Sequence, residues 1–175
     1  MQLSYLPQSR AVPAAFNTVQ YEGYGPGGTA VLIECSTRQR EDLATHLRRL
    51  FAVHGGYLGA QGSVSYLFAR TGVLSYAPTL GSVPLTELAL AAGAEDVHAD
   101  SGGIEILTDP EDFPKVREAL QAAGFVALSA QVTQRAATAV DVSGEVAAAM
   151  RSLVAGLHAL EEVQGVYTNA RFSGT

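Results

Sequence analysis

The amino-acid sequence predicts a globular α+β fold made of two units. Segments whose apolar residues alternate, as in strands, are interleaved with segments whose apolar residues recur every three or four positions, as in helices. The 175 residues are 47% hydrophobic and 16% charged, which allows a core without disulfides and excludes extensive disorder. A low-charge linker around Pro78, Gly81 and Pro84 separates the two units.

The first unit opens with a predicted β-hairpin. Residues 18–24 and 29–35 have strand composition, and Gly25-Pro26-Gly27-Gly28 between them has the composition of a turn. The glycines also invite comparison with loops that bind phosphate through their backbone N–H groups. Their spacing matches neither the dinucleotide fingerprint nor a P-loop, so a structural turn is favoured over an anion site.

A helix is predicted to follow the hairpin over residues 39–53, because its leucines and phenylalanine fall at helical spacing. Thr37 is the expected N-cap, and Gly55-Gly56 ends the helix. His54 could cap the helix carbonyls, or alternatively contact a phosphate. The helix also carries the densest basic cluster of the chain, which is interpreted as a solvated face with nucleic-acid contact as the alternative: Arg38, Arg40, Arg48 and Arg49.

A half-buried strand is predicted over residues 63–69, where Val64, Tyr66 and Phe68 alternate. Gly72 is expected to break it before a short strand over 73–76. Near the C-terminus, a helix over 143–160 is followed by a strand over 163–168.

The second unit is predicted to have the order β-α-β-β-α-β, which is the ferredoxin-like split motif. Asp109 as N-cap and Pro110 as the first helical residue mark the start of its second helix, and Gly124 ends that helix. The six elements, counting the short strand at 73–76 as the first, are expected at residues 73–76, 85–92, 96–99, 104–108, 109–123 and 125–132.

Charge and residue usage narrow the possible functions. The formal net charge of −6 disfavours a broad electrostatic grip on nucleic acid. Cys35 is the only cysteine, so a reducing, cytoplasmic environment is expected, and no segment has the pattern of a membrane span or signal peptide. The histidines lack zinc-ligand spacing, and most carboxylates are explained by turns and helix starts. Neither a metal, nor a cofactor, nor enzymatic activity is therefore predicted.

Five sequence blocks occur in a characteristic order. They are Tyr21-Glu22-Gly23-Tyr24-Gly25-Pro26-Gly27-Gly28, His54-Gly55-Gly56-Tyr57-Leu58-Gly59-Ala60-Gln61-Gly62-Ser63-Val64, Gly93-Ala94-Glu95-Asp96-Val97, Thr108-Asp109-Pro110-Glu111-Asp112-Phe113 and Val163-Gln164-Gly165-Val166-Tyr167-Thr168-Asn169-Ala170. Together they resemble the YebC/PmpR family, which also includes a mitochondrial translational activator. The resemblance covers roughly residues 16–172.

The resemblance implies that the ferredoxin-like unit, residues 77–135, is inserted into a discontinuous α/β unit of residues 16–76 and 136–175, preceded by an arm over 1–15. Family members usually begin with a basic helical domain held responsible for nucleic-acid contact. No such segment stands here, so we expect a naturally shortened relative or a fragment. The family's Thr-Asp-Asn-Arg-Asn-Arg-like run reads Thr37-Arg38-Gln39-Arg40-Glu41-Asp42, which retains only Thr37 and Arg40.

The resemblance also implies a non-enzymatic role in regulating gene expression. Members are usually labelled DNA-binding transcriptional regulators, whereas others associate with ribosomes and act in translation, and the residues leave both roles open. The alternative is a truncated paralogue that acts as a protein-interaction module without binding nucleic acid. Tyrosines beside the glycine turn could stack on bases. The candidate contacts to DNA, ribosomal RNA or the ribosome are Tyr21, Glu22, Tyr24, Gly25, Gly27, Gly28, Arg38, Arg40, Arg48, Arg49 and His54.

Overall fold

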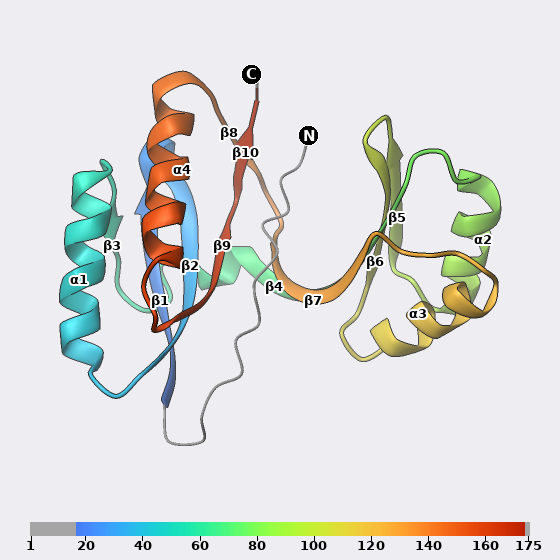
Figure 1. Cartoon of the computed structure of the whole chain (residues 1–175), viewed down its shortest axis with the longest axis horizontal. Coiled ribbons are helices and arrows are strands. Elements are labelled where there is room, and N and C mark those ends of the chain that lie inside the picture. The colour runs from blue at the N-terminus through green and yellow to red at the C-terminus, as the bar shows by residue number, and fades with distance from the viewer. Residues whose placement is uncertain (1–16, 174–175) are drawn as a thin grey trace. The chain divides into compact units, whose positions relative to one another are not determined.

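The computed structural model describes residues 17–173, which form two compact units (Figure 1). The chain up to Ala69 and the chain from Arg135 make up the first unit, and Arg70–Gln134 make up the second. The expected arm over residues 1–15 lies outside the described residues. Antiparallel sheets combined with α-helices confirm the predicted α+β class.

The first unit contains a four-stranded sheet in the order β3-β1-β2-β9. β1 (Asn17–Gly25) and β2 (Thr29–Thr37) pair antiparallel along their full lengths around a 3-10 turn (Pro26–Gly28), which confirms the predicted hairpin. β9 (Val163–Thr168) pairs with the other side of β2, and β3 (Tyr57–Leu58) pairs with β1.

Two helices, α1 (Arg40–Val53) and α4 (Gly144–His158), supply the helical side of the first core. On the sheet side, Val31, Ile33 and Cys35 occupy every second position of β2, so their side chains point to the same face. All three are fully buried. The helices contribute residues at helical spacing, which places them on one apolar stripe. These are Leu43, Leu47 and Phe51 of α1 and Met150, Leu153, Val154 and Leu157 of α4.

α1 starts one residue later than predicted, and its N-cap lies two residues later. Its N-cap is Gln39 rather than Thr37. The Thr37 hydroxyl instead accepts a hydrogen bond from the Gln39 N–H at 3.0 Å, within the link between β2 and α1. Thr37 therefore stabilises the link that leads into the helix, because its side chain binds a backbone N–H before the first turn begins.

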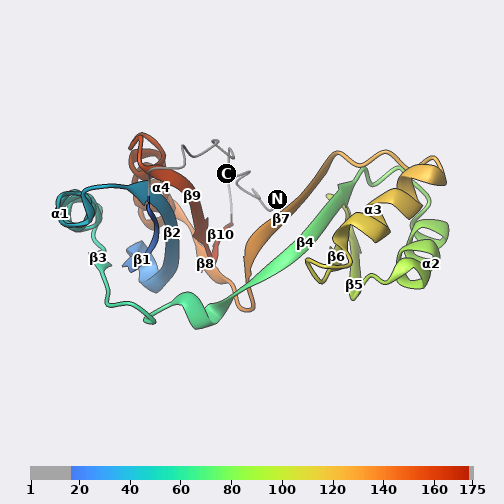
Figure 2. The ribbon, with the colours of Figure 1, turned by 90° about the horizontal axis from the view of Figure 1, so that it is seen from below.

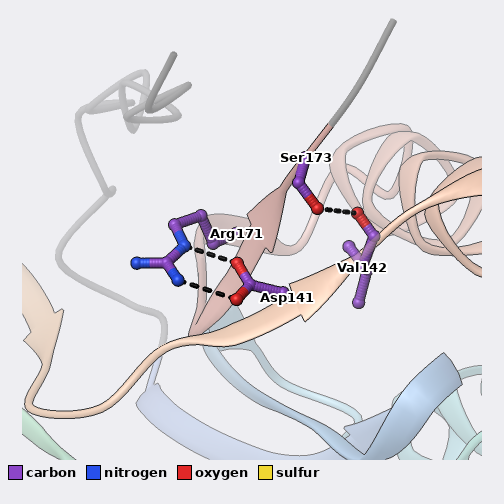
Figure 3. A network of polar contacts seen from close by, with 4 residues as sticks. All are labelled: Asp141, Val142, Arg171 and Ser173. Carbon is purple, nitrogen blue, oxygen red and sulfur yellow. Dashed lines mark hydrogen bonds and ion pairs between the residues drawn. The ribbon is translucent and has the colours of Figure 1, made fainter.

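A parallel pair of short strands, β8 (Val140–Val142) and β10 (Ala170–Phe172), holds the C-terminal end of the first unit. The Arg171 guanidinium donates two hydrogen bonds to the Asp141 carboxylate, one of them from Nη2 to Oδ2 at 2.7 Å (Figure 3). These bonds hold the pKa of Asp141 below its usual value. The Arg151 guanidinium of α4 lies 4.7 Å from the centroid of the Phe172 ring. β10 is thus fastened both to β8 and to α4.

The second unit has the strand order β5-β6-β4-β7. Its strands are β4 (Phe68–Tyr76), β5 (Asp96–Asp100), β6 (Gly103–Thr108) and β7 (Ser129–Ala136), and its helices are α2 (Ser82–Ala92) and α3 (Phe113–Ala122). The order along the chain is β-α-β-β-α-β, and β6 pairs antiparallel with both β5 and β4. Figure 2 shows α2 and α3 together on one side of β5 and β6.

The core of the second unit lies between these helices and one face of the sheet. Leu74 and Ile106 are fully buried there, opposite Leu85 of α2 and Leu120 of α3. The unit begins at Arg70 rather than at residue 77, because β4 pairs with β6. Among the described residues, no helix has both the length and the apolar character needed to cross a membrane.

The predicted strand over 63–69, broken at Gly72, is wrong. Val64 is fully buried whereas Tyr66 is 74% exposed, so these residues do not share a strand face. Residues Ser65–Leu67 form a 3-10 turn, and β4 then runs unbroken through Gly72. A side chain at Gly72 would meet the Thr108 hydroxyl at 2.2 Å, so glycine here permits close strand packing rather than ending the strand.

The start of α3 is also later than predicted, at Phe113 instead of residues 109–110. Asp109 organises a turn before the helix: its carboxylate accepts the Glu111 N–H at 2.9 Å, and its carbonyl accepts the N–H groups of Asp112 and Phe113. Asp112 is the N-cap of the helix itself. The Asp109-Pro110 sequence therefore indicates the turn that precedes α3, and not the first residues of α3 itself.

The last strand of the second unit lies four residues after its predicted start. β7 begins at Ser129 because the segment over 125–128 is irregular, with Val126 79% and Leu128 72% exposed. Apolar residues at 126 and 128 alternate as in a strand, although neither side chain is buried. Gly124 ends the preceding helix as predicted, with a φ of +88° that favours glycine.

Candidate nucleic-acid interface

An open cavity of about 420 Å³ lies at the N-terminal end of α1. Its lining residues are Asn17, Arg38, Gln39, Arg40, Glu41 and Asp42. The hairpin register pairs Asn17 with Thr37, which brings the start of β1 beside the link to α1. The N-terminus of a helix attracts anions, and the two arginines add to this, whereas Glu41 and Asp42 oppose it. The lining of the cavity therefore combines two positive and two negative side chains.

Tyr21 of β1 contacts the first residue of α1, next to this cavity. Its hydroxyl donates a hydrogen bond to the Arg40 carbonyl at 2.8 Å. Burial raises the pKa of Tyr21, the neighbouring Cys35 raises it further, and the charges of Arg40 and Arg48 partly lower it. Arg40 begins the helix, and Arg48 lies about two turns further along it. We refer to Arg38, Arg40 and Arg48 as the α1 arginine surface.

Arg49 does not join this surface. Successive residues of an α-helix are rotated by about 100°, so Arg48 and Arg49 point in different directions. Both are exposed. The basic cluster predicted from the sequence is therefore divided: Arg38 and Arg40 line the cavity at the start of α1, Arg48 lies about two turns later, and Arg49 points to a different side from Arg48.

Strand alternation separates Tyr21 from Glu22 and Tyr24, which the sequence had grouped together. Glu22 is only 3% exposed. Its carboxylate accepts hydrogen bonds from the backbone N–H groups of Gly62, Val64 and Ser65 at 2.8, 2.8 and 2.7 Å. Burial by itself would raise the pKa of Glu22, but the hydrogen bonds outweigh it and lower the pKa. Glu22 therefore anchors the loop over 59–67 and offers little of its surface to a partner.

Tyr24 takes part in an aromatic pair that the sequence did not reveal. Its ring centroid lies 5.2 Å from that of Tyr57, and its hydroxyl donates to the Ser63 carbonyl at 3.0 Å. Tyr57 is 61% exposed, so part of this aromatic surface faces solvent. The sequence signal that could have pointed to Tyr57 is its position directly after Gly55-Gly56, within a block that resembles the family. The Tyr24–Tyr57 pair is thus an aromatic surface of the first unit with the shape to stack on a base, and Tyr66 is a second exposed tyrosine of that unit.

His54 lies at the C-cap of α1, three residues before Tyr57. Backbone N–H groups of His54, Gly55 and Gly56 cap the last helical turn, and the carbonyl of Phe51 accepts from both His54 and Gly56. Gly55 has a φ of +79°, as expected for the residue that ends a helix. The backbone thus supplies the capping that the sequence had assigned to the imidazole, and the His54 side chain is half-buried.

The glycine turn packs under α4. A side chain at Gly25 would meet the Thr29 hydroxyl at 2.7 Å and the Met150 sulfur at 2.8 Å, and one at Gly27 would meet Val146 at 2.8 Å. The Thr29 hydroxyl also donates to the Pro26 carbonyl at 3.0 Å. Gly28 is exposed, with a φ of +73°. These contacts explain Gly25 and Gly27 by packing and support the structural turn over an anion site.

The structure therefore sorts the sequence candidates into two groups on the first unit. One is the α1 arginine surface with Tyr21, to which Asn17 and Gln39 must be added as cavity residues. The other is the Tyr24–Tyr57 pair, and His54 precedes Tyr57 in the chain at the end of α1. Within the described residues, no cluster of three His, Cys, Asp or Glu side chains could hold a metal ion.

The fold and these surfaces define a two-unit α+β protein in which one unit is inserted into the chain of the other. A sequence model described as the TACO1/YebC second and third domain matches residues 16–170. The chain belongs to this family.

Curated relatives agree with this assignment. A protein of Photorhabdus laumondii named "Probable transcriptional regulatory protein" is 46% identical over 157 residues, covering 89% of this chain and 64% of the relative. Proteins with the same description occur in Paraburkholderia xenovorans, at 46% identity with coverage of 90% and 65%, and in Halorhodospira halophila, at 44% with 89% and 64%. The chain thus spans just under two thirds of the length of these relatives.

A solved structure shares the fold. The crystal structure of a conserved hypothetical protein from Aquifex aeolicus matches with a TM-score of 0.76 and 34% sequence identity. The match covers 95% of this chain and 69% of that one. The arrangement of elements described above therefore occurs in another protein whose sequence has diverged considerably.

Proposed function

We propose that this chain is a non-enzymatic regulator of gene expression that acts in the cytoplasm by docking on a ribonucleoprotein, with the ribosome as the favoured target. The α1 arginine surface would contact ribosomal RNA phosphate, and the Tyr24–Tyr57 pair would stack on an unpaired base. The family and the names of the relatives support the regulatory role. The observation that carries the choice of target is the small size of the basic surface on an otherwise acidic chain.

The expected binding energies favour a local contact with RNA over binding along duplex DNA. Binding to a duplex weakens with salt by a slope of about −0.9 per neutralised phosphate, and strong binders neutralise roughly six to ten. Three arginines would give a slope of about −3 and correspondingly weak affinity. Base stacking contributes about 1–3 kcal/mol per base, and folded RNA offers unstacked bases whereas a duplex does not. A ribosomal surface therefore suits this pair of features better.

Transcriptional regulation through DNA is the second candidate function, because the relatives carry that description. It would require phosphate contacts beyond the α1 arginine surface. The third candidate, a protein-interaction module without nucleic-acid binding, fits the acidic charge of the chain. The same experiment separates all three.

Sedimentation of the tagged chain through a sucrose gradient of cell lysate tests the proposal. We expect comigration with ribosomal particles at low salt that is lost after ribonuclease treatment. Replacing Arg38, Arg40 and Arg48 by Gln should abolish comigration. A control with the same change of charge, in which Arg49, Arg70 and Arg117 become Gln, should retain it. If the unmodified chain stays at the top of every gradient, the ribosome is not its target. A salt-dependent shift with a duplex DNA probe would then favour the second candidate.

A further inference from the structure

Two exposed aromatic rings lie close together in the sequence of the first unit. Tyr57 of β3 is 61% exposed, and Tyr66, in the 3-10 turn over Ser65–Leu67, is 74% exposed. Every other tyrosine and phenylalanine that the structure describes is buried or half-buried. Val53, just before them, is also exposed. Single exposed hydrophobic residues are common, whereas several within one short segment indicate an interaction site.

The segment that carries these rings has no charged side chain when histidine is neutral. Residues 50–69 contain no Asp, Glu, Lys or Arg, which makes this the longest uncharged stretch of the chain. Between the two tyrosines, the exposed residues are small or polar, namely Ala60, Gln61 and Gly62. We call residues 57–66 the tyrosine loop. A protein interface has a continuous apolar centre, which this loop does not offer, whereas a base needs only the face of one ring.

Strand β1 positions the backbone at both ends of the tyrosine loop. Tyr57 lies opposite Tyr24 in the pairing of β1 with β3, and their ring centroids are 5.2 Å apart. At the other end, the N–H of Ser65, the residue before Tyr66, donates to the Glu22 carboxylate at 2.7 Å. Both rings are therefore carried by backbone that is fixed before a ligand binds, which lowers the entropy cost of binding.

The surroundings of the tyrosine loop do not repel phosphate. Glu22 is only 3% exposed, and its carboxylate accepts three hydrogen bonds from backbone N–H groups. It therefore presents little negative charge at the surface. The loop itself adds no carboxylate.

We propose that the tyrosine loop binds unpaired nucleotides of RNA, with one base stacked on Tyr57, which Tyr24 supports, and another on Tyr66. The inference rests on the proposed function, to which it adds Tyr66 and the class of ligand, a single strand whose bases are free to stack. Because the loop has no Lys or Arg, its contact neutralises no phosphate and should hardly depend on salt. The α1 arginine surface would supply the salt-dependent part of the binding.

NMR titration of the full chain with an oligouridylate tests this inference. The oligonucleotide has about eight nucleotides, within the range of about 4–16 that stacking domains cover, and an RNA duplex of the same length is the negative probe. We expect the ring resonances of Tyr57 and Tyr66 to shift with the single strand only.

Variants of the two tyrosines separate stacking from other contributions. Tyr57→Leu and Tyr66→Leu should each weaken binding about tenfold, because leucine is apolar but has no ring on which a base can stack. Tyr57→Phe and Tyr66→Phe are the matched controls: they keep the ring and should change the affinity less than about twofold. Circular dichroism would verify that all four variants fold.

Salt dependence distinguishes the tyrosine loop from the α1 arginine surface. The unmodified chain and Tyr66→Leu should lose affinity with salt at the same slope. Replacing Arg38, Arg40 and Arg48 by Gln should flatten the slope while the tyrosine resonances still shift. Equal losses in the Leu and Phe variants, no ring shifts with the single strand, or the same shifts with the duplex would each overturn the inference.

The sucrose gradient decides the proposed function separately. If the chain comigrates with ribosomal particles but the oligonucleotide shifts neither ring, ribosome docking stands and stacking by the tyrosine loop is refuted. If, in addition, Tyr66→Leu abolishes comigration, the rings contact a protein partner instead of RNA. If the rings bind the oligonucleotide but the chain stays at the top of the gradient, the loop binds single strands and the ribosome is not the target.

Discussion

The carboxylate of Glu22 accepts a hydrogen bond from the backbone N–H of Val64 at 2.8 Å, linking two residues far apart in the sequence. Two further N–H groups of the same loop, those of Gly62 and Ser65, bind the same carboxylate. A short stretch without regular structure is thereby fixed against the hairpin. Its position in turn supports Tyr24, whose hydroxyl binds the carbonyl of Ser63 in that loop.

Replacing Glu22 with Ala should lower the free energy of unfolding by about 1–3 kcal/mol, because buried N–H groups would lose their acceptor. Urea unfolding monitored by circular dichroism measures this. Since folding lowers the pKa of Glu22, its contribution is complete above the unfolded value of 4.5 and is lost as the pH falls toward the folded value. In the Glu22→Ala variant, the free energy of unfolding should therefore fall less steeply as the pH is lowered through this range. The exposed Glu161→Gln serves as control, and equal stability of the two variants would refute the role assigned to Glu22.

Gly56→Ala should destabilise the first unit more than Gly55→Ala. A Cβ at Gly56 would lie 2.2 Å from the carbonyl oxygen of Tyr24, a backbone atom that cannot move without displacing β1. Gly55 has open space around it but a φ of +79°, so alanine there costs about 1 kcal/mol in strain. Thermal unfolding of both variants would test the order. The reverse order would show that β3 adjusts easily.

Cys35 should be nearly inert in the folded protein. Burial, followed by the charges of Glu162 and Glu34, raises the pKa of its thiol from 9.0 to about 12. The thiolate fraction at about pH 8 then falls roughly a thousandfold. Reaction with Ellman's reagent should therefore be slow in buffer and fast in denaturant. A Ser101→Cys variant, with its new thiol in an exposed turn, should react fast in both. Rapid labelling of Cys35 in the native protein would contradict the burial.

Asn169→Ala should cost about 1–3 kcal/mol of stability. The Asn169 side-chain oxygen accepts the Ala30 N–H at 2.7 Å, and its backbone N–H donates to the Ala30 carbonyl, between β9 and β10. Removing the side chain leaves a buried N–H of β2 without this acceptor. Gln20→Ala removes only an exposed side-chain contact to Glu34 and should change stability little. Chemical denaturation that gave equal losses would rule out a special role for Asn169.

The hairpin, α1 and the β5–β6 pair could be predicted because each is defined by local signals. The apolar run over 30–35, the leucine spacing of α1 and the turn chemistry at 100–103 are each read within a few residues. The resemblance of the sequence blocks to the family predicted that one unit is inserted into the other. The periodicity of apolar residues carries no information about such an insertion. The candidate site was less predictable, since the four arginines look alike in the sequence and only helix rotation separates Arg49 from the others.

By itself, the sequence determined the α+β class, the family and most helix and strand positions, because apolar periodicity and turn residues act over short distances. Tertiary structure alone decided that Glu22 anchors a loop, that Tyr57 joins Tyr24 and that the Asn169 side chain binds the backbone of β2. Each of these depends on contacts between residues remote in the chain or on the register between strands. Hydrogen bonds and cross-strand neighbours are set by that register, and one residue of shift would move every side chain to the opposite face.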